Sequence, residues 1–382
     1  MKENIKDLSD IKQNIMLNNS SLKKKEVIAM LDGESKFIPA CYSMIAEETI
    51  ISKGKKLLKI LEKYPDDIVR IDPFPSFIGY KTADGREGSF DFYLNKDDTW
   101  TWVDEWGVKW MHTSDSVGVA PVDFPLKNYD GFEQYVRDVM PRGSFPSRIE
   151  SANKQIKNID SWNRKFLVGK GDMVLGIFER AKLIRGMDNL FIDFYYNKKM
   201  VQRLIRELTN YFLAEIEEWS KLNVDAIYYG DDWGSQKNLL ISPELWRELF
   251  KPYYVELINC AHRNNLSVIF HSCGAVTKIV GDLIEIGVDV IHPLQASCND
   301  HSYLAKEFGK DLTIMGGLDV QRELITGNKD QIKKSLYNFV EIFSKYNCGI
   351  LLSPTNTIVP DTPIENIQFA FETMHKISQE SE

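Results

Sequence analysis

The chain has 382 residues, of which 43% are hydrophobic and 27% are charged, and its formal net charge is −8. This composition is typical of a globular protein, and a negative charge without a basic stripe argues against nucleic-acid binding. No apolar run approaches the length of a membrane span, and five scattered cysteines fit a reducing cytosol, so we expect a cytoplasmic protein that does not bind membranes.

A short apolar run, a polar loop and a long amphipathic segment recur along the chain. This alternation predicts parallel βαβ units. Eight such units predict an α/β protein with a (β/α)8 TIM barrel, in which active-site residues lie at the C-terminal ends of the strands. The eight candidate strands are Phe37–Tyr42, Asp67–Ile71, Phe166–Val168, Ala226–Tyr229, Val268–His271, Val288–Ile291, Leu312–Met315 and Ile350–Ser353.

Several helix boundaries between these strands carry capping residues. Ser242 followed by Pro243 predicts the start of a helix that runs to about Asn264. Gly287 predicts the end of the next helix. Thr362, in the sequence Thr-Pro-Ile-Glu, has the spacing of a capping box and is expected to open the last helix.

Residues 74–162 interrupt the alternation, because they are too many for a connection between a strand and a helix. We expect an antiparallel β insertion after the second strand, within a single domain that spans residues 1–382. The sequence Asn95–Asp98 predicts a hairpin turn in it. It contains the alternating aromatic residues Phe90, Phe92, Tyr93, Trp100, Trp102, Trp106 and Trp110, and the tryptophans are expected to pack the insertion against the barrel rather than to form a ligand cage.

The fifth candidate strand ends in His271, Ser272, Cys273 and Gly274. Residues two apart on a strand point to the same face, so the imidazole and the thiol are expected to lie together. Both are good ligands for zinc, and this position in a barrel is where active sites form. The alternative is that His271 is a hydrogen-bonded core histidine and Cys273 a small buried hydrophobe.

Other strand ends carry polar residues that a barrel would bring to one cavity. Asp231 and Asp232 adjoin, so they are expected to point apart, one toward the cavity and the other toward a helix end or a backbone amide. Gly316 and Gly317 either let the backbone approach a ligand or form a tight turn. The remaining candidates are Tyr228, His292, Gln295, Asp319 and Asn356.

Four ordered motifs over the second half of the chain resemble the uroporphyrinogen decarboxylase superfamily. They are YYGDDWGSQKNLLISPELWRELFKPYY, HSCGAVTKIVGDLIEIGVDVIHPLQ, MGGLD and LLSPTNTIVPDTPIENI. Together with DEWGVKW in the insertion, they are similar to the branch that holds corrinoid-linked methyltransferases, including methylcobamide:coenzyme M methyltransferases. The resemblance implies a TIM barrel, in agreement with the strand pattern.

The resemblance to that branch also implies a zinc ion, held by a His-x-Cys pair and a further cysteine after the last strand. The pair falls on His271 and Cys273, but Asn356 stands where the further cysteine is expected. Asparagine is a poor zinc ligand because its amide oxygen is neutral and hard. A third ligand is expected from Cys298 in the loop after the sixth strand, from Asn356 itself, or from a carboxylate such as Asp231 or Glu179.

The implied reaction moves a methyl group between a corrinoid on a small partner protein and a small-molecule thiol. Zinc lowers the pKa of the acceptor thiol, so that a thiolate is present at neutral pH. The expected catalytic residues are Asp231, Asp232, Gln295 and Asp319. The expected substrate-binding residues are Tyr228, Gly316, Gly317 and Asn356.

Two other functions remain open. One is a metal-free carboxy-lyase that uses Asp231 or Asp232, but the arginine-bearing RQAGRY-type motif of the decarboxylases is replaced here by IPACYSMIAEE. A substrate with many carboxylates needs several cations, and Arg180 and Arg185 are the best available. The other is a non-catalytic subunit, which would not itself carry a corrinoid because the chain lacks the DxHxxG signature.

Overall fold

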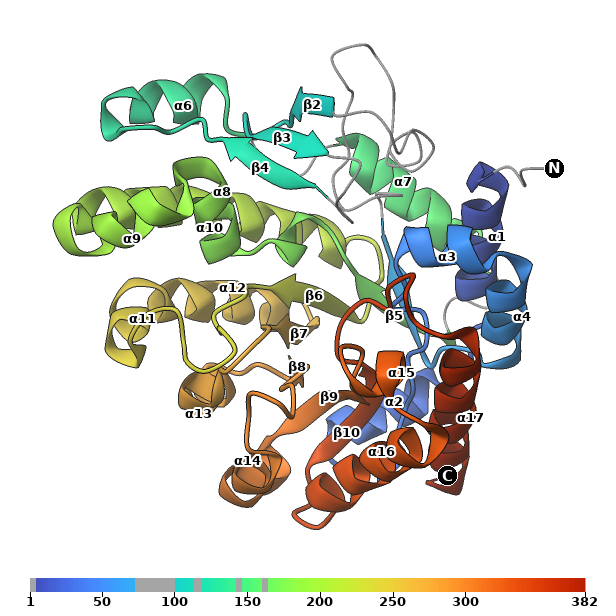
Figure 1. Cartoon of the computed structure of the whole chain (residues 1–382). Coiled ribbons are helices and arrows are strands. Elements are labelled where there is room, and N and C mark those ends of the chain that lie inside the picture. Colours follow the sequence, from blue (N-terminus) through green and yellow to red (C-terminus); the bar gives the residue numbers. More distant parts are fainter. Residues whose placement is uncertain (1–4, 73–99, 113–118, 142–145, 160–163, 382) are drawn as a thin grey trace.

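The computed structural model describes residues 5–72, 100–112, 119–141, 146–159 and 164–381 (Figure 1). Its centre is a curled sheet of seven strands, and every neighbouring pair is parallel. In spatial order the strands are β1 (Ile68–Ile71), β5 (Phe166–Gly169), β6 (Ala226–Gly230), β7 (Ser267–His271), β8 (Val290–His292), β9 (Thr313–Leu318) and β10 (Gly349–Pro354). Seven of the eight expected strands are therefore confirmed.

The expectation of a strand at Phe37–Tyr42 is wrong in detail, and a closed barrel of eight strands is not confirmed. This segment makes one isolated parallel bridge, between Ala40 and Leu352 of β10. On its other side, the Asp67 N–H donates to the Ala40 carbonyl at 2.9 Å. The segment thus lies between the two edges of the curled sheet without forming a regular ladder.

On the side toward β1, the reason is that carboxylates bond the backbone donors, whereas the Cys41 N–H donates to Leu352 of β10 at 2.8 Å. The N–H of Ala40 donates to the Asp67 side chain at 2.7 Å, and the N–H of Tyr42 donates to the Asp66 side chain at 2.5 Å. Pro39 has no N–H to offer. A ladder of backbone hydrogen bonds cannot form where its donors are already used or missing.

Helices surround the curled sheet (Figure 1). Among the described residues, none of them combines the length and apolarity needed to cross a bilayer. They are α1 (Ile5–Asn18), α2 (Lys24–Leu31), α3 (Glu47–Lys53), α4 (Lys55–Lys63), α6 (Phe132–Asp138), α7 (Pro146–Lys157), α8 (Ile177–Arg185), α9 (Met187–Tyr196), α10 (Lys198–Ser220), α11 (Pro243–Leu249), α12 (Lys251–Arg263), α13 (Thr277–Glu285), α14 (His301–Phe308), α15 (Glu323–Thr326), α16 (Lys329–Ser344) and α17 (Ile364–Glu380).

The expected helix caps are confirmed in part. The Ser242 side chain accepts a hydrogen bond from the Leu245 N–H, as expected, but the helix ends before Phe250 and a second one follows. Pro252 explains the break, because it cannot donate a hydrogen bond to the preceding turn. Gly287 follows α13 with a φ of 91°, as expected, whereas α17 begins without a side-chain cap, so the expected capping box at Thr362 is wrong.

The expected antiparallel insertion is confirmed as a sheet of three strands. They are β2 (Trp100–Val103), β3 (Lys109–His112) and β4 (Ala120–Asp123). Trp106 is buried and packs on Tyr211 of α10 with ring centroids 4.7 Å apart, so the insertion lies against the helical layer beside the barrel. The expected turn at Asn95–Asp98 lies outside the described residues, as do Phe90, Phe92 and Tyr93.

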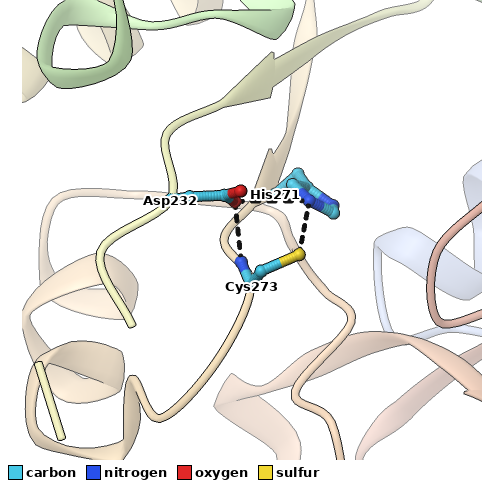
Figure 2. Close-up of side chains that lie close together, drawn as sticks. All are labelled: Asp232, His271 and Cys273. Atoms are coloured by element: carbon cyan, nitrogen blue, oxygen red, sulfur yellow. Dashed lines mark hydrogen bonds and ion pairs between the residues drawn. The ribbon is translucent and has the colours of Figure 1, made fainter. Parts of the chain in front are cut away.

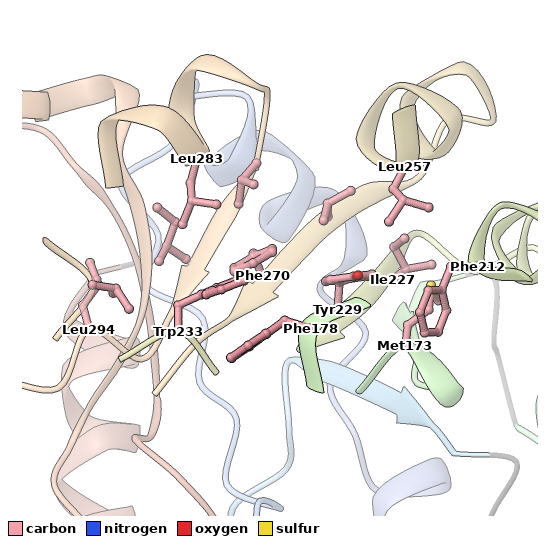
Figure 3. Packing of buried hydrophobic residues seen from close by; sticks show 14 of the residues in the cluster. Met173, Phe178, Phe212, Ile227, Tyr229, Trp233, Leu257, Phe270, Leu283 and Leu294 are labelled. Carbon is pink, nitrogen blue, oxygen red and sulfur yellow. The ribbon is translucent and has the colours of Figure 1, made fainter. Parts of the chain in front are cut away.

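Side-chain alternation on the parallel strands determines what faces the interior. Ile227, Tyr229 and Phe270 point outward and pack against the helices with Phe212 and Leu257 (Figure 3). A second apolar cluster fills the interior and includes Ile68, Phe166, Val168, Ala226, Ile269, Val290, Met315 and Leu351. Because side chains on a strand point alternately to its two faces, the residues two positions further toward the C-terminal end of each strand also face inward. They include Tyr228, His271 and His292.

A partly buried ionic network ties the insertion to the parallel sheet. Arg148 of α7 pairs with Glu105 of the insertion and with Asp172, which follows β5. The Glu215 carboxylate accepts a hydrogen bond from the Asp172 N–H at 2.8 Å. Burial is the main cause that raises the pKa of Glu215 to about 8, with the Asp172 charge second.

The Glu215→Gln variant tests this burial through the pH dependence of stability. The unfolded chain releases the Glu215 proton at about pH 4.3, whereas the folded chain keeps it until about pH 8, so the wild type loses stability through this window. Glutamine retains an oxygen for the Asp172 N–H and has no proton to lose. Denaturant unfolding from pH 5 to 9 should show that the free energy of unfolding of the variant rises relative to that of the wild type up to about pH 8. Above this pH the difference should stay constant. A difference that stays constant with pH would contradict the assignment.

Candidate metal centre

Three side chains at the C-terminal ends of β6 and β7 converge on one point (Figure 2). The Cys273 sulfur lies 3.3 Å from Nε2 of His271, and the same nitrogen lies 3.5 Å from an oxygen of Asp232. One ligand atom from each of the three lies within 4.8 Å of the others. The expectation that His271 and Cys273 lie together therefore agrees with the geometry, and Asp232 joins them.

The donor set fits a zinc ion. Zinc bonds of about 2.3 Å to sulfur and about 2.0–2.2 Å to nitrogen and oxygen, at tetrahedral angles, place neighbouring ligand atoms about 3.3–3.6 Å apart. The two distances at Nε2 of His271, 3.3 Å and 3.5 Å, lie in this range. An imidazole, a thiolate and a carboxylate are ligands that zinc accepts, and three protein ligands leave the fourth position for a substrate.

The backbone of the β6 loop holds the β7 loop at close range. A Cβ on Gly274 would lie 2.3 Å from the Gly234 carbonyl oxygen, and Gly274 has a φ of 79°, which favours glycine. The Gly234 N–H donates to the Cys273 carbonyl at 3.1 Å, and the Ala275 N–H donates to the Ser235 carbonyl at 2.8 Å. These contacts fix the position of Cys273 relative to the β6 loop.

Side chains complete the support of this loop. Asp232 accepts a hydrogen bond from the Cys273 N–H at 2.9 Å, so its carboxylate is already oriented at the site. Gln295 is buried and accepts from the Gly274 N–H at 2.8 Å. Gln295 was expected to act on substrate, and the structure instead places its side chain beneath the loop that carries Cys273.

The electrostatics of the site keep the thiol neutral unless a cation is bound. Burial raises the pKa of Cys273, the nearby Asp232 carboxylate raises it further, and the Asn356 amide, which donates to the sulfur from 3.3 Å, partly offsets this. Burial lowers the pKa of His271, against the opposing effect of Asp232. A metal ion would reverse the balance at the sulfur, because a coordinated thiol is deprotonated.

Asp231, expected to be catalytic, points away from Asp232 and is fully buried. Its two oxygens accept hydrogen bonds from the N–H groups of Phe178 at 2.9 Å and Glu179 at 2.7 Å, in the first turn of α8. The Tyr254 hydroxyl donates to it at 2.5 Å. Burial raises the pKa of Asp231 to about 7. The structure thus gives Asp231 the role of fixing a helix end, and the alternation along the chain sends Asp232 to the site.

Several other expected site residues have structural partners. Asp319 accepts hydrogen bonds from the N–H groups of Gln321 and Arg322, which folds its own turn. A Cβ on Gly316 would lie 2.8 Å from the Pro293 carbonyl oxygen, and one on Gly317 would lie 2.9 Å from the Phe339 ring. The two glycines are therefore required by packing.

Of the expected third metal ligands, Cys298, Asp231 and Glu179 do not join His271 and Cys273, whereas the Asn356 amide nitrogen lies 3.3 Å from the Cys273 sulfur. Among the described residues, the only trio of possible metal ligands includes Asp232 and not Cys298. The Cys298 sulfur lies 3.6 Å from the Gln236 side-chain oxygen instead. Glu179 forms an ion pair with Lys182. The sequence placed Asp232 at the end of the neighbouring strand, but it did not show whether Asp231 or Asp232 faces the site.

Tyr228 and His292 lie beside the trio on the inner face. The Tyr228 hydroxyl is 3.0 Å from Nδ1 of His292, and His292 is fully buried. The sequence marked His292 only as a polar residue at the end of a strand. Nothing in the sequence pattern indicated that its ring contacts the ring of His271.

Residues 176–377 match the family model of Uroporphyrinogen decarboxylase (URO-D). The uroporphyrinogen decarboxylase of Wigglesworthia glossinidia brevipalpis is 27% identical over 191 residues, which cover 48% of this chain and 50% of that protein. The enzyme of the same name from Geotalea daltonii is 25% identical over 190 residues, which cover 49% and 52%. The match thus spans about half the length of these curated relatives.

A solved methyltransferase from Methanosarcina mazei has the same fold. It superposes with a TM-score of 0.67 at 15% sequence identity and covers 94% of this chain and 99% of that one. At this identity the likeness concerns the fold alone.

The adjacent carboxylates should respond differently to the same substitution. Asp231→Asn turns an amide N–H toward a helix N–H that has lost its acceptor, so we expect a loss of about 1–3 kcal/mol in the free energy of unfolding at pH 8. Asp232→Asn retains an oxygen for the Cys273 N–H and should change the free energy of unfolding by less than about 0.5 kcal/mol. Denaturant unfolding of both variants measures the difference. Equal effects would contradict the division of roles.

Proposed function

The chain belongs to the uroporphyrinogen decarboxylase family, and from this premise we propose that it is a methyltransferase that moves a methyl group from a protein-bound corrinoid to a thiol. The observation that carries the proposal is the trio of Asp232, His271 and Cys273 at the C-terminal ends of two neighbouring parallel strands. This is the end of such a sheet where catalytic groups gather.

The trio would hold a zinc ion through His271 Nε2, the Cys273 sulfur and an oxygen of Asp232. When bound, zinc lowers the pKa of a coordinated thiol, so that a thiolate is available at neutral pH. The residues around the trio then keep the site in shape. Asp232 is held by the Cys273 N–H, and the Asn356 amide donates to the Cys273 sulfur.

The methyl donor in this proposal is a corrinoid bound to a small partner protein. The acceptor is a small molecule with a thiol. Both assignments rest on the resemblance of the motifs to the methyltransferase branch of the family.

The names of the curated relatives favour a second candidate, a carboxy-lyase without a metal. Three of the four residues named for this reaction have structural partners, and the fourth, Asp232, faces His271 and Cys273. Asp231 holds the first turn of α8, and Arg185 pairs with Asp193 at 2.7 Å. Arg180 lies over the Trp106 ring at 4.4 Å. The geometry therefore favours methyl transfer.

Zinc affinity tests the trio directly. Cys273→Ala and Asp232→Asn should each weaken zinc binding by at least about 100-fold, because each removes or neutralises a ligand. Asn356→Cys should tighten it, because it adds a thiolate next to the Cys273 sulfur. A competitive titration with a chromophoric chelator measures all three, with Asp231→Asn as the matched control that retains wild-type affinity. Wild-type affinity in the Cys273→Ala or Asp232→Asn variant would exclude the site.

Activity tests the reaction. Pure zinc-loaded protein should transfer the methyl group of free methylcobalamin to one or more members of a panel of small thiols, and Cys273→Ala should abolish the transfer. The absorbance change of the corrinoid on demethylation reports turnover. Repeated turnover of uroporphyrinogen by decarboxylation would instead support the carboxy-lyase.

A further inference from the structure

His292 contacts the candidate ligand His271 from the neighbouring strand. The two residues are paired in register between β7 and β8, and both side chains face the interior. Nδ1 of His292 lies 2.6 Å from Nδ1 of His271, and Nε2 of His292 lies 3.1 Å from the Pro354 carbonyl oxygen. His292 has no exposed surface, so these contacts are not exchanged with solvent.

Counting protons determines the direction of these hydrogen bonds. The Pro354 carbonyl can only accept, so Nε2 of His292 must carry a proton. A neutral imidazole has one N–H, which leaves Nδ1 of His292 as an acceptor. The proton between the two Nδ1 atoms therefore belongs to His271.

The opposite direction would require a doubly protonated His292. Among the described residues, the hydrogen-bond partners of its ring are a carbonyl, the Tyr228 hydroxyl and the His271 ring, none of which is an anion. A buried cation without a counter-charge is costly, so this arrangement is disfavoured.

We propose that His292 is a positioning residue that holds His271 in the tautomer with a proton on Nδ1. The lone pair of His271 Nε2 then points to the side where Cys273 and Asp232 lie, 3.3 Å and 3.5 Å away. The consequence for metal binding rests on the proposed function, whereas the tautomer is a property of the metal-free chain. Histidine ligands of metals characteristically donate their other ring N–H to a fixed acceptor, and here a second histidine is that acceptor.

Tyr228 supports the arrangement from a third strand. Its ring lies beside both imidazoles, with centroids 5.8 Å from His271 and 6.0 Å from His292. Its hydroxyl reaches the same Nδ1 of His292 from 3.0 Å, a longer contact than that of His271. A neutral Nδ1 has a single lone pair, which the shorter contact assigns to His271, so the Tyr228 hydroxyl shields this nitrogen and does not supply its hydrogen bond.

The tautomer can be read by NMR from metal-free protein labelled with ¹⁵N in histidine. The chain has six histidines, and the signal lost in His271→Asn assigns the ring of interest. Two-bond nitrogen–proton correlations distinguish a protonated from an unprotonated ring nitrogen. We expect a proton on Nδ1 and none on Nε2 of His271. A proton on Nε2 in the wild type would overturn the proposal, whether or not any variant folds.

Two substitutions of His292 separate positioning from packing. His292→Asn places an oxygen close to the position of Nδ1 and should retain both the His271 tautomer and zinc affinity within a few-fold. His292→Leu fills the space without an acceptor, so His271 should populate the other tautomer and zinc affinity should fall by about 10–100-fold. His262→Asn removes a ring that pairs with Asp289 at the protein surface and is the matched control without effect on His271.

The outcomes distinguish this inference from the proposed function. If His271 carries its proton on Nδ1 but the wild type does not bind zinc, the positioning role stands and the proposed function fails. If zinc binds equally well to the wild type and to folded His292→Leu protein, the positioning role fails and the metal site stands.

Discussion

The contact between the backbones of Gly234 and Gly274 is the constraint on which the site depends. A side chain at either position would collide with the opposite loop at 2.5 Å or less. Because both are glycine, the loops after β6 and β7 lie against each other and exchange backbone hydrogen bonds. The separation of Asp232 and Cys273 is therefore set by the main chain, and a site held by rigid elements is preorganised for its ligand.

Two adjacent aspartates have different roles because neighbouring side chains on a strand point to opposite faces of the sheet. Asp231 turns outward and binds the first turn of α8, while Asp232 turns inward to His271 and Cys273. The motif resemblance implies two cysteines and a histidine around zinc, and this chain has Asn356 in place of one cysteine. In the proposed site, the carboxylate of Asp232 would restore the lost negative charge, so the total charge around the ion would be unchanged.

Much of the fold could be predicted because it depends on local patterns. The apolar runs located seven parallel strands, and the i, i+2 spacing placed His271 beside Cys273. The segment Phe37–Tyr42 was misjudged because the N–H groups of Ala40 and Tyr42 bond to the side chains of Asp67 and Asp66, contacts that a hydrophobic pattern does not encode. The third member of the trio could not be chosen, because alternation predicts that Asp231 and Asp232 diverge but not which one faces inward. The contact between His271 and His292 could not be predicted from the sequence either, because it depends on the register of two strands that are 21 residues apart at this point.

The anomalous scattering of crystals of zinc-loaded protein, recorded on both sides of the zinc absorption edge, tests the central claim most directly. The account predicts one strong peak, about 2.0–2.3 Å from the Cys273 sulfur, Nε2 of His271 and an oxygen of Asp232. A peak bonded to Nδ1 of His271, or one beside Cys298 with Asp232 unbound, would contradict it.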